Sequence, residues 1–156
     1  MADQHALDLQ FMAAAIDEAR QGLAENGIPI GSVIVVDGKI IGRGHNRRVQ
    51  QGNPILHGEM DAFQNAGRQP ASVYARATLY TTLSPCTMCG GTAVLYKIPR
   101  IVMGENRTVA STGTLCEDWL RGHGIAVVNL DLQECVDLMN EFIRRFPEVW
   151  NEDVGV

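Results

Sequence analysis

Segments with the pattern of a helix and segments with the pattern of a β-strand alternate along most of this chain. Apolar residues recur every three or four positions over residues 7–26, which is typical of an amphipathic helix, and Gly27 ends the pattern. Two β-rich runs follow, at residues 30–36 and 39–44, and Asp37-Gly38 joins them. Because Asp-Gly tolerates the positive φ angles of a two-residue type I′ turn, the sheet is expected to begin with an antiparallel hairpin.

The rest of the chain follows a strand-then-helix order. The patterns predict helices over 56–67, 84–96, 115–124 and 131–146, and strands over 77–83, 100–104 and 125–130. Asp131 has Glu134 three residues after it, the spacing of a capping box at the start of the last helix, and Pro147 ends that helix. Strands connected through helices run parallel, so the expected fold is an α/β three-layer α/β/α sandwich with a five-stranded mixed sheet.

Length and charge limit the class of protein. A chain of 156 residues has room for a single domain, expected here over 1–156, and a net charge of −5 argues against broad contact with nucleic acid. The basic pairs Arg47-Arg48 and Arg144-Arg145 are expected to be solvated. The chain has neither an apolar run long enough for a membrane span nor the pattern of a secretory signal, which predicts a cytoplasmic location and no membrane partner.

Two cysteines and a histidine have the pattern of a metal site. Ser84 and Pro85 are expected to be the N-cap and first residue of a helix, so that Cys86 and Cys89 lie in and just past its first turn. Free N–H groups there favour thiolates, and residues three apart on a helix are neighbours. His57 supplies a third ligand. Three protein ligands are typical of a catalytic zinc site, because a structural zinc site has four.

Glu59 lies two residues after His57, a spacing that makes it a poor ligand but leaves it within reach of a metal-activated water. We therefore expect it to act as a general base and then as a general acid. The other histidines show no ligand spacing and are expected at the surface, while the remaining cysteines are expected in the core; these residues are His5, His45, His123, Cys116 and Cys135. Taken separately, the two cysteines could be a redox pair and His57 a core histidine.

The segments "GIPIGSVIV", "GRGHNRR", "LHGE", "TLYTTLSPCTMC", "IPRIVMGEN" and "VWNEDVG" together resemble the fungal-type cytosine deaminases, of the cytidine deaminase superfamily. His-x-Glu followed by Pro-Cys-x-x-Cys is the signature of zinc-dependent base deaminases. The resemblance spans almost the whole chain. It implies a cytidine deaminase-like fold, one Zn²⁺ per subunit, a homodimer, and conversion of cytosine to uracil and ammonia.

The resemblance also implies roles for individual residues. His57, Cys86 and Cys89 would bind zinc, and Glu59 would carry protons from the attacking water to the ring nitrogen and the leaving amine. The substrate contacts would come from the Asn46 side chain, the backbone of Gly58, Ser84 and Cys86, and the side chains of Trp150 and Asp153. Residues 147–156 would form a C-terminal lid, in which Asp153 accepts the N1–H of the ring. A nucleoside should then be refused, because its N1 carries ribose.

Two positions depart from the fungal pattern. Val109 and Asn151 stand where those enzymes carry aromatic residues, which predicts a roomier or differently shaped pocket. Isocytosine, creatinine or guanine is therefore an alternative substrate. A tRNA adenosine deaminase shares the zinc motif but acts on a polyanion, which the acidic composition disfavours. A non-enzymatic, zinc-stabilised binding module is the remaining alternative, and it would need a fourth protein ligand.

Overall fold

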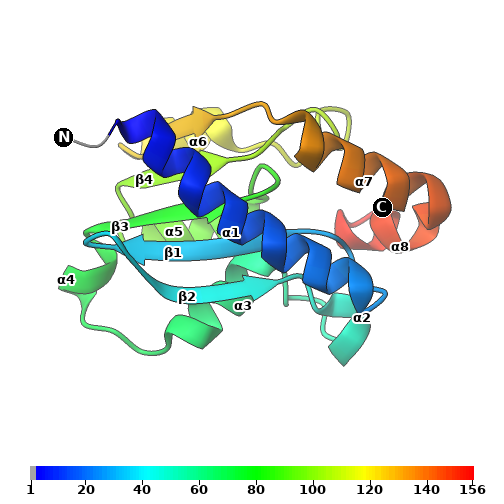
Figure 1. The fold of residues 1–156 in the computed structure, drawn as a ribbon, viewed down its shortest axis with the longest axis horizontal. Coiled ribbons are helices and arrows are strands. Elements are labelled where there is room, and N and C mark those ends of the chain that lie inside the picture. The colour runs from blue at the N-terminus through cyan, green and yellow to red at the C-terminus, as the bar shows by residue number, and fades with distance from the viewer. Residues whose placement is uncertain (1–2) are drawn as a thin grey trace.

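The computed structural model describes residues 3–156, so Met1 and Ala2 of the expected domain lie outside the described part. Its centre is one five-stranded sheet in the order β2-β1-β3-β4-β5 (Figure 1). The strands, in chain order, are β1 (Gly31–Val36), β2 (Lys39–His45), β3 (Ala77–Thr81), β4 (Arg100–Met103) and β5 (Ala126–Asn129). The predicted five-stranded mixed sheet is therefore confirmed.

The sheet is antiparallel at one edge and parallel at the other. β1 pairs antiparallel with both β2 and β3, whereas β3, β4 and β5 run parallel. The turn between β1 and β2 has positive φ at both central residues, 50° at Asp37 and 77° at Gly38, as the Asp-Gly pair predicts. The parallel strands are joined through helices, as parallel pairing requires.

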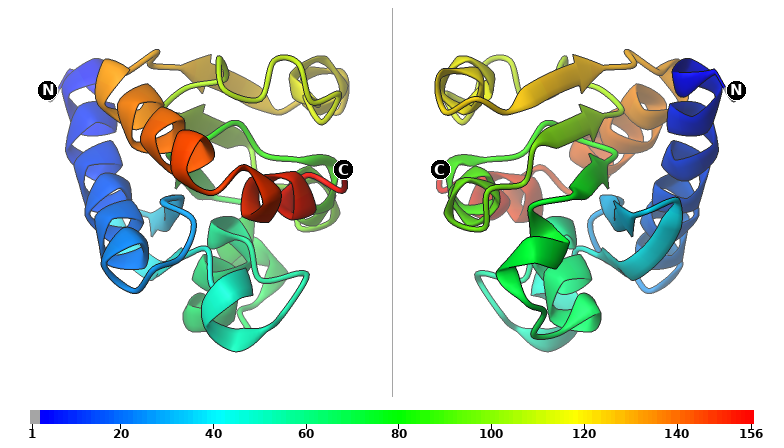
Figure 2. Two further views of the ribbon diagram at one scale, coloured as in Figure 1. Left: turned by 90° about the vertical axis from the view of Figure 1, so that its right-hand side faces the viewer. Right: turned by 90° about the vertical axis from the view of Figure 1, so that its left-hand side faces the viewer.

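Helices cover both faces of the sheet (Figures 1 and 2). On one face, α1 (Gln4–Ala24) and α7 (Gln133–Arg145) bury Met12, Ile16 and Cys135 against alternate residues of β1, β3 and β4. On the other, α3 (Gly58–Ala66), α5 (Thr87–Leu95) and α6 (Glu117–Gly122) bury Ala62, Ala93 and Leu120 against the opposite side chains of the same strands. These layers confirm the predicted α/β/α sandwich.

Three short helices complete the fold. α2 (Arg48–Gln51) and α4 (Ala71–Tyr74) lie in connections whose sequence gave no helical signal. α8 (Pro147–Asp153) starts at the proline that ends α7, and it turns back so that Trp150 packs with Phe142 of α7. Figure 1 shows α8 folded back beside α7. None of the helices within residues 3–156 combines the length and the apolar character needed to span a bilayer.

Two predicted helix starts are wrong. α5 begins at Thr87 with Cys86 as its N-cap, so Ser84 and Pro85 precede the helix. α7 begins at Gln133 with Leu132 as N-cap and without a side-chain cap, because Asp131 has a φ of 50° and its carboxylate pairs with Arg107 at 2.9 Å. In both places a tertiary contact uses the side chain that the local pattern assigned to a cap: the Ser84 hydroxyl donates to Glu117 at 3.3 Å.

Candidate active site

The cysteines and the histidine of the predicted metal site meet where two helices begin. His57 is the N-cap of α3 and Cys86 is the N-cap of α5, both with extended backbone, and Cys89 is the third residue of α5. Each helix follows a loop that leaves the sheet, so both N-termini point at the same region. The free N–H groups of a first turn favour negative charge, which suits thiolate ligands.

The distances between the ligand atoms fit a tetrahedral zinc ion. His57 Nδ1 lies 3.5 Å from Cys86 Sγ and 3.6 Å from Cys89 Sγ, and all three atoms lie within 4.8 Å of one another. Zn–N and Zn–S bonds of about 2.1 and 2.3 Å at a tetrahedral angle put nitrogen and sulfur about 3.6 Å apart. Across residues 3–156 no fourth His, Cys, Asp or Glu joins this group, so one position is left for water or substrate.

The charges at the site favour an anionic sulfur at Cys86. The pKa of Cys86 falls to about 4, chiefly because the Cys89 thiol donates to its sulfur and His57 lies beside it, although burial opposes the change. Burial alone would lower the pKa of His57, but the hydrogen bond with Cys86 and the negative charge of Asp153 raise it to about 9. The protein therefore holds a thiolate ready for a cation. The site fits zinc by its donor set and by its spacing.

Glu59 lies in the first turn of α3 and its side chain is buried. Its Oε1 accepts hydrogen bonds from the Thr81 hydroxyl at 2.7 Å and the Ser32 hydroxyl at 3.3 Å. Burial raises the pKa of this carboxyl, the negative charge on Cys86 adds to the increase, and His57 opposes it. A carboxyl with a raised pKa, fixed beside a metal site, is suited to accept and return a proton near neutral pH.

Asp153 connects α8 to the metal site. Its Oδ1 accepts from Asn46 Nδ2 at 2.9 Å and lies 3.5 Å from both Arg48 Nη1 and His57 Nε2, and the side chain is 4% exposed. Because Asn46 Oδ1 accepts from the Arg48 backbone N–H at 3.1 Å, the Asn46 amide group is oriented with its NH₂ toward Asp153. A carboxylate beside the second nitrogen of a ligand histidine is the usual outer-shell partner of a metal site.

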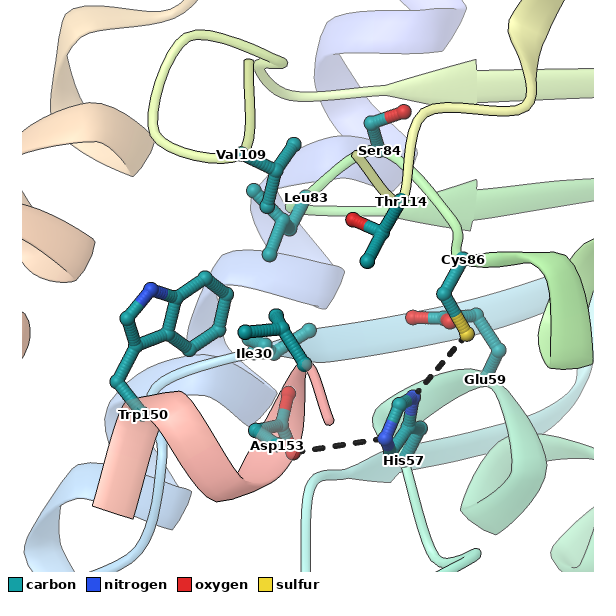
Figure 3. A pocket seen from close by; sticks show the side chains of 11 residues that line it. Ile30, His57, Glu59, Leu83, Ser84, Cys86, Val109, Thr114, Trp150 and Asp153 are labelled. Atoms are coloured by element: carbon teal, nitrogen blue, oxygen red, sulfur yellow. Dashed lines mark hydrogen bonds and ion pairs between the residues drawn. The ribbon is translucent and has the colours of Figure 1, made fainter. Parts of the chain in front are cut away.

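A narrow cavity lies between these groups (Figure 3), and the space open to the centre of a water molecule is about 30 Å³. His57, Glu59 and Cys86 form one side and Asp153 a second, while the remaining wall is mostly apolar and also contains Ser84 and Thr114. The lining residues are Ile30, His57, Glu59, Leu83, Ser84, Cys86, Val109, Thr114, Trp150, Asp153 and Val154. A cavity of this size suits a small ligand and not a large one.

The site residues expected from the sequence are distributed as follows. Asn46, Gly58 and Cys89 do not line the cavity: Asn46 contacts Asp153, Cys89 is covered, and Gly58 packs on the Ile30 carbonyl. The other expected contacts line it. Val109 lies in the wall, whereas Asn151 is exposed and away from the cavity. The departure at Asn151 therefore does not shape this pocket, and the departure at Val109 does.

Several residues near the site were not expected there from the sequence. Arg48 was expected to be solvated, but its side chain is 14% exposed and faces Asp153. His45 was expected at the surface, but it is 2% exposed and lies between the carboxylates of Glu18 and Glu25 at 2.9 and 2.7 Å. Thr114 was not considered. Only the position of Arg48, directly after "GHNR", carried a signal, whereas the other two depend on tertiary contacts.

Comparisons with known proteins agree with this geometry. Residues 5–105 match the family described as the cytidine and deoxycytidylate deaminase zinc-binding region. The chain is 48% identical over 149 residues to the cytosine deaminase of Candida albicans, covering 95% of this chain and 97% of that protein. It is 36% identical over 141 residues to the tRNA-specific adenosine deaminase of Streptococcus pyogenes serotype M1, covering 86% and 82%.

A solved structure of a guanine deaminase from Nitrosomonas europaea shares the fold, with a TM-score of 0.70 over 91% of this chain and 85% of that chain, at 22% identity. The resemblance to the fungal cytosine deaminases is thus confirmed at the level of sequence, and the cytidine deaminase-like fold at the level of structure. The zinc-binding family and the His57, Cys86 and Cys89 group establish zinc as the cofactor. This chain belongs to the cytidine and deoxycytidylate deaminase family, and it is a zinc-dependent hydrolase of carbon–nitrogen bonds in an aminated base.

Proposed function

We propose that the enzyme deaminates free cytosine to uracil and ammonia. The observation that carries this proposal is the position of Asp153, which lines the cavity on a different side from Glu59 and accepts a hydrogen bond from Asn46 at 2.9 Å. A carboxylate suits the N1–H of cytosine when the amine of the base faces the metal ligands, and Asn46 orients that carboxylate from outside the cavity. The Candida albicans relative, named a cytosine deaminase, supports the same substrate.

The roles proposed for the protein's own groups follow from their positions. His57, Cys86 and Cys89 hold zinc, which supplies Lewis acidity and lowers the pKa of water toward about 7. Glu59 accepts a proton from the attacking water and delivers it to the ring nitrogen beside the aminated carbon. The new C–O bond forms at the aminated carbon. Glu59 then passes the second water proton to the amine, and the C–N bond breaks to release ammonia. Thr81 and Ser32 hold the Glu59 oxygen in place.

Substrate selection depends on the cavity and on Asp153. A buried carboxylate that loses its N–H partner is left unsatisfied, so a base substituted at N1 is rejected strongly. Trp150 and Val109 form apolar parts of the wall, and the backbones of Ser84 and Cys86 are placed to contact the ring and its amine, whereas Gly58 lies behind the wall. Cytidine and a base within a polynucleotide are excluded on this argument.

We propose that residues 147–156 act as a lid within a single domain over 1–156. Trp150 is 5% exposed and lines the cavity, and Asp153 fastens α8 to Asn46 and Arg48. Because Trp150 and Asp153 of this helix form part of the cavity wall, we infer that the helix moves when a substrate enters. Such a movement would expose Asp153 and open the cavity on the side of α8.

We also propose a homodimer formed through the outer surface of α3 and α5. Ile55, Leu95 and Tyr96 are 54%, 70% and 43% exposed, and they line a groove with Phe63 and Met60. Contiguous apolar exposure of this kind marks an interaction surface. Leu95→Glu should then produce monomers in light scattering coupled to size exclusion. A cytoplasmic enzyme of nucleobase salvage is the cellular role that fits a free-base substrate.

The test is ammonia release from a panel of bases by the purified, zinc-loaded enzyme. We expect cytosine to give a kcat/KM at least tenfold above isocytosine, creatinine, guanine and adenine, and cytidine to give no ammonia. A higher value for one of the other bases would reassign the substrate, and no release from any base would refute the proposal. Metal content is measured on the same sample, so that loss of zinc is not mistaken for lack of activity.

A further inference from the structure

The loop between β4 and α6 brings two threonines together at the wall of the cavity. Gly113 has a φ of 74°, in the left-handed region that favours glycine, and the hydroxyls of its neighbours Thr112 and Thr114 lie 2.7 Å apart. The Thr112 hydroxyl also lies 2.8 Å from the Val109 carbonyl oxygen, to which it donates. Thr114 lines the cavity, whereas Thr112 does not.

The number of available protons decides which of the two threonine hydroxyls donates to the other. A threonine hydroxyl has one proton to donate, and Thr112 gives it to the Val109 carbonyl, which has none of its own. The contact between the two hydroxyls therefore needs the proton of Thr114. In residues 3–156 the Thr114 oxygen has no other hydrogen-bonding partner, so its lone pairs remain available. Thr114 presents an acceptor, and not a donor, at the cavity wall.

Within residues 3–156, Thr114 carries the only hydroxyl that can hydrogen-bond a ligand at this part of the cavity wall. Ser84 also lines the cavity, but its hydroxyl donates to Glu117 and points away from the cavity in Figure 3. The hydroxyl oxygen of Thr114 lies on the side of Leu83 and Val109 in the same view. Those two neighbours are apolar and offer no competing hydrogen bond. Val109 is also smaller than an aromatic residue and leaves space beside the hydroxyl.

The orientation of the base, which rests on the proposed function, decides which ring atom faces Thr114. The amine faces His57 and Cys86, and N1–H faces Asp153. The ring carbons C5 and C6 then face the part of the wall that is formed by Leu83, Val109 and Thr114. C5 is next to the aminated carbon, and Thr114 lies near Cys86, so a substituent at C5 reaches Thr114 first.

We propose that Thr114 is a specificity-determining residue, whose hydroxyl oxygen accepts a hydrogen bond from an N–H or O–H substituent on the ring carbon next to the aminated carbon. The substrate class widens from cytosine to 5-amino- and 5-hydroxycytosine. A 5-methyl group has the same size as the amino group but cannot donate a hydrogen bond. It therefore keeps water away from the Thr114 oxygen without replacing the lost hydrogen bond, which weakens binding. The enzyme therefore distinguishes two 5-substituents of equal size by their ability to donate.

The test compares kcat/KM for 5-aminocytosine and 5-methylcytosine in each of four zinc-loaded enzymes: wild type, Thr114→Val, Thr114→Ser and Ser111→Ala. The two substituents differ electronically, but that difference is the same in every enzyme and cancels when ratios are compared. A neutral hydrogen bond is worth about twofold to tenfold in such a ratio. We expect Thr114→Val to lower the amino-to-methyl ratio by that factor and Thr114→Ser to retain it.

Ser111 is the matched control, because it lies in the same loop but is exposed and does not line the cavity. Its variant should keep the wild-type ratio. An equal ratio in wild type and Thr114→Val, or the same loss in Ser111→Ala, would overturn the proposal.

A binding measurement separates this proposal from the proposed function. Dissociation constants of 5-aminouracil and 5-methyluracil are measured by calorimetry for the same four enzymes, since these products require no turnover. The same twofold to tenfold change in ratio is expected for Thr114→Val. If cytosine released no ammonia, the proposed function would fail while this ratio still decided the role of Thr114. Absence of binding by both products would overturn the role proposed for Thr114, and ammonia release from cytosine would still decide the proposed function.

Discussion

The substitution Asp153→Asn tests the proposed recognition of the base most directly, because it removes one charge and keeps the size of the side chain. Asp153 Oδ1 accepts from Asn46 Nδ2 at 2.9 Å, and the orientation of Asn46 is fixed by its other contact, to the Arg48 backbone. An asparagine at this position has a single acceptor oxygen. That oxygen can accept from the Asn46 NH₂ group or from the N1–H of cytosine. Whichever donor it does not serve is then left facing the NH₂ group of the new asparagine.

The size of the effect follows from the burial of the side chain, which is 4% exposed. A hydrogen bond to a charged group contributes about 1.5–3 kcal/mol, and an unsatisfied buried donor costs about 1–3 kcal/mol. Together these terms give about 2.5–6 kcal/mol, and each 1.4 kcal/mol corresponds to a factor of ten. We therefore expect kcat/KM for cytosine to fall by at least about sixtyfold and by as much as about ten-thousandfold.

The assay is initial-rate ammonia release over a range of cytosine concentrations, at saturating zinc. Saturation matters because Asp153 lies 3.5 Å from His57 Nε2, and loss of such an outer partner lowers metal affinity by about 10–100-fold. Glu152→Gln is the matched control, because it removes the same charge from the neighbouring exposed position. A kcat/KM within threefold of wild type in zinc-loaded Asp153→Asn would refute this account of recognition.

Three further predictions concern the proton carrier, the metal and the fold. Glu59→Gln should keep zinc and lose kcat by about a thousandfold or more, since no other carboxylate lines that side of the cavity; near-normal turnover with full zinc would reassign the carrier. Removal of zinc by a chelator should abolish ammonia release and lower the melting temperature, and added zinc should restore both. Gln21 and His45 lower the pKa of Glu25 to about 2 by hydrogen bonding. Because the pKa is lower in the folded protein than the unfolded value of about 4.3, ionised Glu25 stabilises the fold above that unfolded value, and this stabilisation is lost as the pH falls toward 2. The difference in free energy of unfolding between wild type and Glu25→Gln should be constant from pH 6 to 8 and should narrow below about pH 4.5, and a constant difference down to pH 3 would contradict this.

The layers of the fold could be predicted from the sequence because they depend on local periodicity. The turn at Asp37-Gly38 and the helix end at Gly67 have the positive φ angles that their residue types favour. In each case the preference of one or two residues agrees with the tertiary structure. The same reasoning predicted His57, Cys86 and Cys89 as zinc ligands, and the structure brings these three side chains together, since the spacing of the two cysteines along the chain decides their distance.

Local reasoning was wrong where a side chain had a more distant partner. Asp131 and Ser84 are good N-cap residues, but Arg107 and Glu117 use their side chains instead. His45 follows a strand and would be exposed if α1 did not place Glu18 and Glu25 on either side of it. The partners in each of these pairs are separated by 20 or more residues, so no pattern within a single element contains them.

The difference between the two halves of the site has the same origin. The proposed catalytic half, with His57, Glu59, Cys86 and Cys89, is built from the first turns of two helices, and each turn carries its own short motif. The proposed recognition half joins Asn46 to Asp153 across 107 residues, and it includes Thr114 in a loop where Gly113 has a positive φ. Under these proposals the chemistry depends on short motifs, whereas substrate choice depends on contacts that form only on folding. Substitutions in the loop around Val109 and Thr114 are then expected to change which base is used without disturbing the zinc site.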